Sequence, residues 1–406
     1  MDMPSDWDDA AYCAHNRDVA LAIERGEMPN GWYHYDAYGR KEGRGGRWFP
    51  PDGARMTREC SDPWNYLEIS NSHGLKPCCN YPAIAQWKPE GPSIEELRNS
   101  QPFRDLRASL ITGHLSATCR NCHIRAQVAV EPETEQPGAG KSSNEARLDA
   151  APLRHLRIEI TSRCNLRCVY CAVSQPSYAG ADMSAQVFDD VLATVANLPR
   201  DTHIMVNGHG ESTFHPQWMT LCDGLTQRGF RPSIITNLAR RLDDAEARCL
   251  ARFIVVQISL DTVDAEQLAQ IRRRVRLSTI VENIDQIRQA ARALGVQPPR
   301  FALSCGVFDL NFAGLEQVAD FAIEKAVASV TFWELVKYPD VPGASNVNSV
   351  ASLDPEEIAK AVRCLDNTLA KLQEAGITTE VAGDFLDRWR RVGLGVSGRP
   401  AGLLPT

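Results

Sequence analysis

The sequence has no run of about 18 or more apolar residues, so it predicts no membrane-spanning helix. Its N-terminus, MDMPSDWDDAAYC, is acidic and lacks the apolar segment of a secretory signal. The formal net charge of −7 argues against a nucleic-acid surface, and the basic run RRRVR (272–276) is interpreted as a solvated helix face or a phosphate-facing loop. We therefore expect a cytoplasmic protein, in which clustered cysteines are metal ligands or catalysts before they are disulfides.

The 13 cysteines of the 406-residue chain are not evenly spread. Five lie between residues 60 and 122: Cys60, Cys78, Cys79, Cys119 and Cys122. Three more are crowded into the stretch RIEITSRCNLRCVYCAV: Cys164, Cys168 and Cys171. The remaining five are scattered, and scattered cysteines are usually small buried hydrophobes. The two crowded groups are therefore the candidate metal ligands.

The sequence pattern divides the chain into five segments. Residues 1–50, with NRDVALAIERG and HYDAYGRKEGR, form a predicted small helical module. They are similar to a module found beside bacterial glycan-related and secreted proteins, so an interaction or packing role is the default. Residues 51–125 hold the first cysteine group, and residues 126–150 have the Pro, Gly, Glu and Ser content of a linker. Residues 151–345 alternate strand and helix patterns, and residues 346–406 add a helical extension.

Six short β-branched runs alternate with amphipathic helical runs after residue 150. The strand candidates are 156–160, 203–208, 232–237, 253–261, 300–307 and 329–336. Such βα units predict a parallel sheet with right-handed crossovers. Six units are fewer than the eight of a closed barrel, so the predicted fold class is α/β, a partial (β/α)6 parallel barrel with a small N-terminal α+β module. In such folds the chemistry lies at the carboxyl ends of the strands.

The cysteine triplet follows the first of these strands directly and has the spacing C-x3-C-x2-C. Thiolates are soft ligands that favour iron–sulfur clusters, zinc or copper(I). A four-iron cluster in an ordinary electron carrier uses four cysteines, so three cysteines would leave one iron open. The alternative is a zinc site that borrows a distant fourth ligand. The position at the start of a six-unit βα array favours the open cluster.

With Tyr170 before its last cysteine, the triplet resembles the signature of the radical S-adenosylmethionine (radical SAM) superfamily. The resemblance implies a [4Fe-4S] cluster whose open iron binds SAM. It further implies reductive cleavage of SAM to a 5′-deoxyadenosyl radical, which abstracts a substrate hydrogen, and an electron donor such as flavodoxin or ferredoxin. The competing hypothesis is a non-catalytic iron–sulfur or zinc scaffold protein, against which the intact triplet and Glu211 argue.

Three strand ends offer SAM contacts by the same resemblance. The second strand ends in NGHGES, which is similar to the Gly-Gly-Glu motif that binds the amino group of SAM, although His209 departs from that motif. Relatives contact the carboxylate and ribose of SAM from the ends of the third and fourth strands. The predicted cofactor-binding residues are Tyr170, Gly208, His209, Gly210, Glu211, Asn237, Ser259 and Asp261. The alternative for Asn237 and Ser259 is a simple strand-end cap.

The early cysteines form a second candidate metal centre. Cys119 and Cys122 make a C-x2-C ligand hairpin, and Cys60 with Cys78 or Cys79 would complete four ligands, which also suits a zinc ribbon. The segment resembles the twitch or SPASM module of radical SAM enzymes, which implies an auxiliary [4Fe-4S] cluster that relays or accepts an electron. The Pro-Cys pattern selects Cys78 and the Gly-x4-Cys pattern selects Cys79, so this choice stays open.

Two further residues are candidates for the reaction itself. An auxiliary cluster that accepts an electron suits oxidation of a substrate radical, whereas quenching by a hydrogen donor would give epimerisation. Cys305 is a hypothetical hydrogen donor, because alternation along the fifth strand could point it into the barrel; the plainer interpretation is a small buried residue. Glu334, in FWELV, is a candidate for substrate or adenine contact, unless a one-residue strand shift puts it on the surface.

The sequence shows no winged-helix-like domain for a leader peptide, which argues against a ribosomal peptide substrate. It shows no cobalamin-binding domain, which argues against B12-dependent methylation. The expectation is oxidation (dehydrogenation) or epimerisation of a sugar, nucleotide-sugar or amino-acid-like small molecule. A peptide-modifying enzyme that forms thioether or carbon–carbon crosslinks is the alternative. No nucleic-acid or membrane partner is expected.

Overall fold

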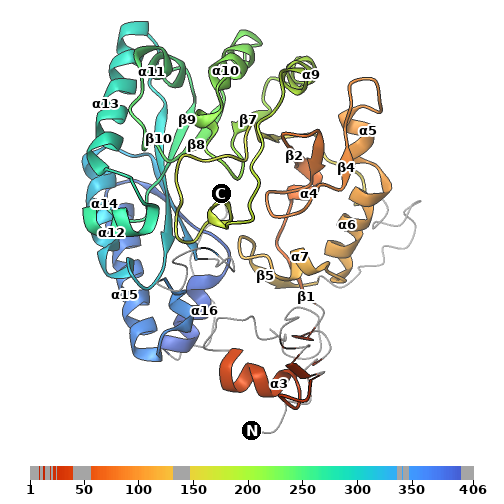
Figure 1. Cartoon of the computed structure of the whole chain (residues 1–406), viewed down its shortest axis with the longest axis vertical. Helices are drawn as coiled ribbons and strands as arrows, with labels where there is room; N and C mark the ends of the chain where they lie inside the picture. The colour runs from red at the N-terminus through yellow and green to blue at the C-terminus, as the bar shows by residue number, and fades with distance from the viewer. Residues whose placement is uncertain are drawn as a thin grey trace.

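The computed structural model describes residues 25–39, 56–130, 147–335 and 347–394, together with a few single positions elsewhere (Figure 1). Much of the predicted helical module 1–50 and the chain after residue 394 lie outside the described residues. Within that module, a short helix α3 (Gly31–His34) runs into a π-helical turn (Tyr35–Gly39).

One ten-stranded sheet organises the chain, in the order β12-β11-β10-β9-β8-β7-β6-β2-β3-β4. All neighbouring pairs from β12 to β2 are parallel, whereas β3 and β4 are antiparallel additions at one edge. The strands are β2 (Tyr66–Ile69), β3 (Gly74–Lys76), β4 (Ala85–Gln86), β6 (His155–Ile158), β7 (His203–Val206), β8 (Ser233–Thr236), β9 (Val255–Ser259), β10 (Arg300–Val307), β11 (Ser329–Glu334) and β12 (Thr378–Val381). The six strands predicted after residue 150 are β6 to β11, so the predicted parallel α/β architecture is confirmed.

The sheet continues past the six predicted strands at both ends. β2 comes from the early cysteine segment and pairs in parallel with β6, with Glu68 opposite Arg157. β12 comes from the C-terminal extension and pairs in parallel with β11. Leu67 and Ile69 of β2 are fully buried, so β2 gains apolar burial as it covers what would otherwise be an open sheet edge.

Helices surround the outside of the sheet (Figure 1). They are α9 (Ala185–Val195), α10 (Trp218–Gln227), α11 (Asp244–Leu250), α12 (Ala265–Arg272), α13 (Leu277–Leu294), α14 (Leu315–Glu324), α15 (Pro355–Glu374) and α16 (Phe385–Leu394). Helix α13 buries Ile280, Ile284 and Ile287, which share one face at helical spacing. Among the described helices, none combines the length and the apolar character that crossing a membrane requires.

The sheet buries one face and leaves the other partly accessible. On β9, Val256 and Ile258 are fully buried, whereas Val255, Gln257 and Ser259 are partly exposed. Strands β7 and β11 alternate in the same way. Interior strands of a parallel sheet are usually covered on both faces. The partly exposed face is therefore where this fold leaves room for ligands. We call it the inner face of the sheet.

The early cysteine segment (orange in Figure 1) is a small α+β unit. Its β1 (Met56–Arg58) pairs antiparallel with β5 (Gln127–Ala129), and it contains α4 (Asp62–Asn65), α5 (Ile94–Arg98), α6 (Gln101–Thr112) and α7 (Ala117–Arg120). α5 and α6 are separate helices, because Ser100 between them has extended backbone and Pro102 lies in the first turn of α6.

Two buried arginines join this unit to the chain that leads into β6. Arg98 donates from Nη2 to the carbonyl oxygens of Trp64 (2.5 Å) and Ala151 (2.7 Å). Arg107 donates from Nη1 to the carbonyl oxygen of Leu148 at 2.9 Å. Buried guanidinium groups need such partners, so these bonds fix the unit against the start of the barrel.

Candidate functional site

The cysteine triplet lies in the loop that leaves the carboxyl end of β6. Cys168 is buried, and Cys164 and Cys171 are half-buried. The N–H groups of Leu166 and Val173 donate to the sulfurs of Cys164 and Cys171. Burial raises the pKa of Cys164 to about 11 and that of Cys168 to about 12. Burial thus favours the neutral thiols, whereas a bound metal favours the thiolates, which coordinate it. Three thiols on one loop are a donor set that suits an iron–sulfur cluster.

The loop after β7, which carries GHGE, rests on the cysteine loop. A Cβ atom at Gly210 would lie 2.2 Å from the carbonyl oxygen of Arg163, and one at Gly208 would lie 2.2 Å from Cγ of Glu159. The N–H of Glu211 donates to the same Arg163 oxygen at 2.9 Å. Glycine is needed at both positions because two segments touch there.

The carboxylate of Glu211 is buried and hydrogen-bonded. Its Oε1 accepts from the N–H (3.2 Å) and hydroxyl (2.8 Å) of Thr213 and from the hydroxyl of Thr236 at 2.8 Å. Its Oε2 accepts from the N–H of Asn237 at 2.7 Å. These bonds tie the end of β8 to the GHGE loop. Among the described residues Oε2 accepts the Asn237 N–H, and its second lone pair can accept a further donor.

Asn237 and Ser259 lie at the ends of β8 and β9. The Nδ2 of Asn237 donates to Oδ1 of Asn165 at 2.8 Å and lies 3.9 Å from the sulfur of Cys164. Ser259 is partly exposed and lies opposite Ser304 of β10. Asn237 therefore borders the cysteine loop directly, whereas Ser259 is placed on the inner face.

Tyr170 and Asp261 are engaged with Arg272, the first residue of the basic run 272–276. Asp261 is fully buried and accepts from Arg272 Nε (2.8 Å), Arg272 Nη2 (3.1 Å), the Tyr170 hydroxyl (2.9 Å) and the Gly306 N–H (2.9 Å). The Arg272 guanidinium also lies 5.7 Å from the centroid of the Tyr170 ring. The first arginine of the basic run is thus not solvated, and this group holds the cysteine loop against β9 and β10.

Cys305 lies on the core side of β10. It is fully buried, as are Leu303 and Val307 on the same side of the strand, and its sulfur lies 3.6 Å from the carbonyl oxygen of Asp261. The partly exposed residue of this strand is its neighbour Ser304. A hydrogen donor must reach the substrate radical, so Cys305 is not proposed further in that role.

Glu334 ends β11, but its carboxylate contacts the C-terminal helix α16. Oε1 accepts from Trp389 Nε1 and the Ser349 hydroxyl, each at 3.1 Å, and Oε2 accepts from Arg388 Nη2 at 2.5 Å. The side chain is buried, so the surface placement considered for it does not occur either. These partners give the carboxylate a structural task, the attachment of α16.

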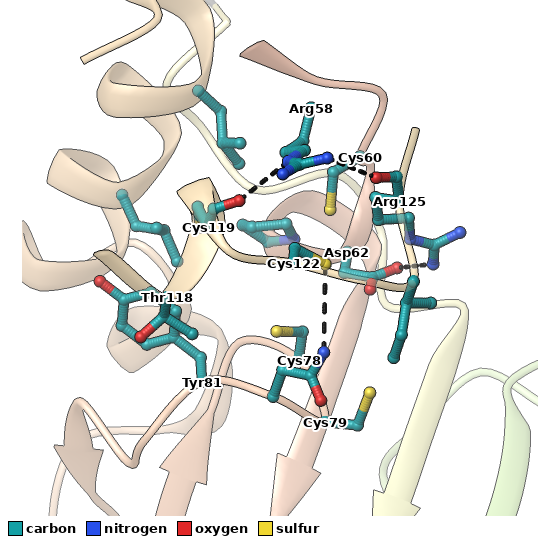
Figure 2. A pocket seen from close by; sticks show the side chains of 15 residues that line it. Arg58, Cys60, Asp62, Cys78, Cys79, Tyr81, Thr118, Cys119, Cys122 and Arg125 are labelled. Carbon is teal, nitrogen blue, oxygen red and sulfur yellow. Dashed lines mark hydrogen bonds and ion pairs between the residues drawn. The ribbon is translucent and has the colours of Figure 1, made fainter. Parts of the chain in front are cut away.

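The five early cysteines line one open hollow (Figure 2). They come from the segment after β1, the turn after β3, and the α7 region: Cys60, Cys78, Cys79, Cys119 and Cys122. Burial raises the pKa of Cys60 and of Cys78 to about 12. Arg58, at the end of β1, donates to the carbonyl oxygens of Cys119 and Arg125, each at 3.0 Å, and so ties the segment that carries Cys119 and Cys122 to β1.

The five thiols around this hollow are soft donors of the kind that hold zinc or an iron–sulfur cluster.

Residues 158–322 match the family model described as Radical SAM superfamily. The chain is 28% identical over 177 residues to a tungsten-containing aldehyde ferredoxin oxidoreductase cofactor-modifying protein of Pyrococcus furiosus, which covers 43% of this chain and 49% of that protein. It is 26% identical over 269 residues to a GTP 3',8-cyclase of Pseudomonas fluorescens, which covers 60% of this chain and 77% of that protein. The chain thus spans about half the length of the first of these relatives.

Solved structures with a similar arrangement include SuiB of Streptococcus suis bound to S-adenosylmethionine. That match has 16% identity and a TM-score of 0.43 and covers 57% of this chain and 50% of the other. A second is anSMEcpe with bound AdoMet, with 17% identity, a TM-score of 0.43 and coverage of 57% and 61%. The matched family model and the related sequences show that residues 158–322 are a radical SAM domain.

Proposed function

We propose that this chain is a SAM-dependent radical enzyme that acts on a polar small molecule, with its [4Fe-4S] cluster on Cys164, Cys168 and Cys171. The observation that carries the proposal is that three thiols share one loop at the carboxyl end of β6, next to the accessible inner face of the sheet. Such a cluster with SAM supplies a 5′-deoxyadenosyl radical that removes a hydrogen atom from the substrate.

The chain's own residues would orient SAM from the strand ends around that loop. The free position on Glu211 Oε2 suits an ammonium group, because a carboxylate forms a strong charge-assisted bond with a cation. Gly208 and Gly210 let the GHGE loop approach the cysteine loop, Asn237 borders Cys164, and Ser259 offers a hydroxyl group on the inner face.

Tyr170 and Asp261 have a different proposed role. Their polar groups bond to each other and to Arg272, so we assign them to holding the cysteine loop rather than to contact with adenine or ribose. His209 is exposed and lies toward the early cysteine segment, where its strongest charged neighbours are Glu159 and Lys76. We therefore assign His209 to the substrate side.

An auxiliary cluster on the early cysteines is part of the proposal. Cys60, Cys119 and Cys122 would supply three ligands. The fourth is assigned to Cys78, whose sulfur accepts backbone N–H bonds, as the sulfurs of Cys164 and Cys171 do. Such a closed cluster suits an electron acceptor, which favours net oxidation of the substrate over epimerisation.

The relatives' names do not select one reaction, since they include a cyclase and a cofactor-modifying protein. Oxidation or epimerisation of a sugar, nucleotide-sugar or amino-acid-like molecule remains the first proposal. Polar inner-face residues such as Gln257, Ser304 and Thr331 support it. Peptide crosslinking is the second, because a long, partly exposed inner face can also admit an extended chain.

Iron analysis tests the proposal directly. Wild type and a Cys164/Cys168/Cys171→Ala variant would be reconstituted anaerobically, and iron and 5′-deoxyadenosine measured. Each four-iron cluster adds about four irons, so we expect about eight per chain in wild type and about four in the variant. Only the wild type should form 5′-deoxyadenosine from SAM and reductant. Wild type without that product would refute the proposed enzyme, and a variant without iron would refute the auxiliary cluster.

A further inference from the structure

A row of charged side chains crosses three neighbouring strands where the early cysteine segment joins the barrel. Lys76 of β3 lies opposite Glu68 of β2, and Glu68 lies opposite Arg157 of β6. Lys76 Nζ is 2.6 Å from Glu68 Oε1, whereas Arg157 Nε is 3.4 Å from Glu68 Oε2. This row, called the charge row below, therefore holds two cations for one carboxylate, and that carboxylate is closer to the lysine.

Arg157 is the member of the charge row with donors to spare. Its Nε donates to the carbonyl oxygen of Asn207 at 3.2 Å, and it also hydrogen-bonds to the side chain of Tyr66. A guanidinium carries five N–H donors, and the described residues engage only part of this set. The flanking Leu156 and Ile158 are fully buried, whereas Arg157 is partly exposed. The arginine side chain is therefore on the inner face of the sheet.

The loop after β7 brings a further polar side chain to the same place. The N–H of His209 donates to Oε1 of Glu159 at 2.8 Å, and its imidazole is exposed. Burial of its surroundings nevertheless lowers the pKa of His209, and Glu159, Lys76, Glu68 and Arg157 are the charged groups that act on that pKa. The charge row, Glu159 and His209 therefore lie together where the loop after β7 meets β6 and the early cysteine segment.

A second carboxylate at this place, Glu159, accepts from the His209 N–H, and the Arg157 side chain, which is 16% exposed, meets Glu68 only at 3.4 Å. A largely buried guanidinium is costly unless an anion pairs closely with it. We propose that the charge row, with His209 beside it, anchors an anionic group of the substrate, a carboxylate or a phosphate. The planar fork of Arg157 matches both groups, since each presents two oxygens to it. This inference rests on the proposed function and narrows its substrate class to anionic small molecules.

The early cysteine site offers another anion for the same arginine. Arg157 is the charged group that acts most strongly on the pKa of Cys79, which lines the cysteine hollow. A metal-bound thiolate there would also attract a cation. The two explanations differ in whether removal of the arginine changes binding of a free anion or only the properties of the auxiliary cluster.

The test uses the anaerobically reconstituted full chain and two probes, inorganic phosphate and acetate, titrated by calorimetry at low ionic strength. Arg157→Met and Arg157→Gln remove the cation. Arg154→Met is the matched control, because Arg154 lies just before the same strand and is exposed beside Asp201. We expect one probe to bind the wild type and to bind both Arg157 variants about 10- to 150-fold more weakly, the usual range for a charge-assisted hydrogen bond. Binding to the control should be unchanged.

The identity of the bound probe distinguishes the two kinds of anion. Binding by phosphate alone indicates a phosphorylated substrate, and binding by acetate alone indicates a carboxylate. Wild-type affinity in the folded Arg157 variants, equal loss in Arg154→Met, or no binding of either probe to wild type would overturn the inference. A changed cluster spectrum with unchanged probe affinity would assign Arg157 to the auxiliary site instead. If Arg157→Met does not fold, Arg157→Gln decides.

Substrate-free formation of 5′-deoxyadenosine is measured on the same samples. Its absence in wild type would refute the proposed function, whatever the probes show. Its presence together with unaltered probe binding in the Arg157 variants would refute only the anion anchor.

Discussion

Replacement of Asp261 by asparagine tests how the cysteine loop is held. Asp261 and Arg272 pair at 2.8 Å, and their side chains are only 0% and 6% exposed. Asparagine keeps the shape but removes the charge, so the guanidinium is left as a buried cation without a carboxylate. Removal of one partner from a buried ion pair costs about 3–5 kcal/mol. We expect the free energy of unfolding of Asp261→Asn to fall by this amount, a large part of the usual total of about 5–15 kcal/mol.

Anaerobic urea unfolding, followed by tryptophan fluorescence, measures this loss. The matched control is Asp223→Asn, because Asp223 pairs with Arg252 at 3.3 Å with both side chains well exposed. Exposed pairs contribute about 0–1 kcal/mol, so the control should stay close to wild type. The double variant Asp261→Asn/Arg272→Met leaves no unpaired buried charge and should recover part of the lost stability. A loss in Asp261→Asn no larger than in Asp223→Asn would refute the reasoning.

Three further changes have expected outcomes. Gly210→Ala forces a Cβ to 2.2 Å from a backbone oxygen of the cysteine loop, so it should lower the free energy of unfolding by about 1–3 kcal/mol and lower the iron content. The control Gly91→Ala meets only one backbone oxygen, at 3.4 Å, and should keep wild-type stability and iron content. Glu334→Gln weakens the attachment of α16, so limited proteolysis should cut that helix faster; an unchanged rate would contradict this role. Burial lowers the pKa of His203 from 6.5, so the unfolded chain binds more protons than the folded chain and stability falls as the pH drops through about 6.5. Between about pH 7 and pH 5, the urea midpoint of His203→Gln should therefore decline less than that of wild type.

Much of the fold is predictable because its signals are local. Strands β6 to β11 are contiguous β-branched runs, and their separation by amphipathic helical runs indicates parallel βα units. The cysteine triplet is local too, because C-x3-C-x2-C needs no knowledge of distant residues. Strand β12 is missed, because TTEV is only four residues long, carries one apolar residue and depends on pairing with β11.

By itself, the sequence determined the α/β class, the six βα units, the triplet and the existence of a second cysteine group. Only the tertiary structure decided that Asp261 pairs with Arg272, that Lys76, Glu68 and Arg157 form one row, and that Cys305 faces the core. The physical reason is that the conformational preference of each residue and the periodicity of apolar residues are local signals, which act over a few residues and so determine single elements. Cross-strand pairing depends instead on register, and a shift of one residue moves every side chain of a strand to the other face.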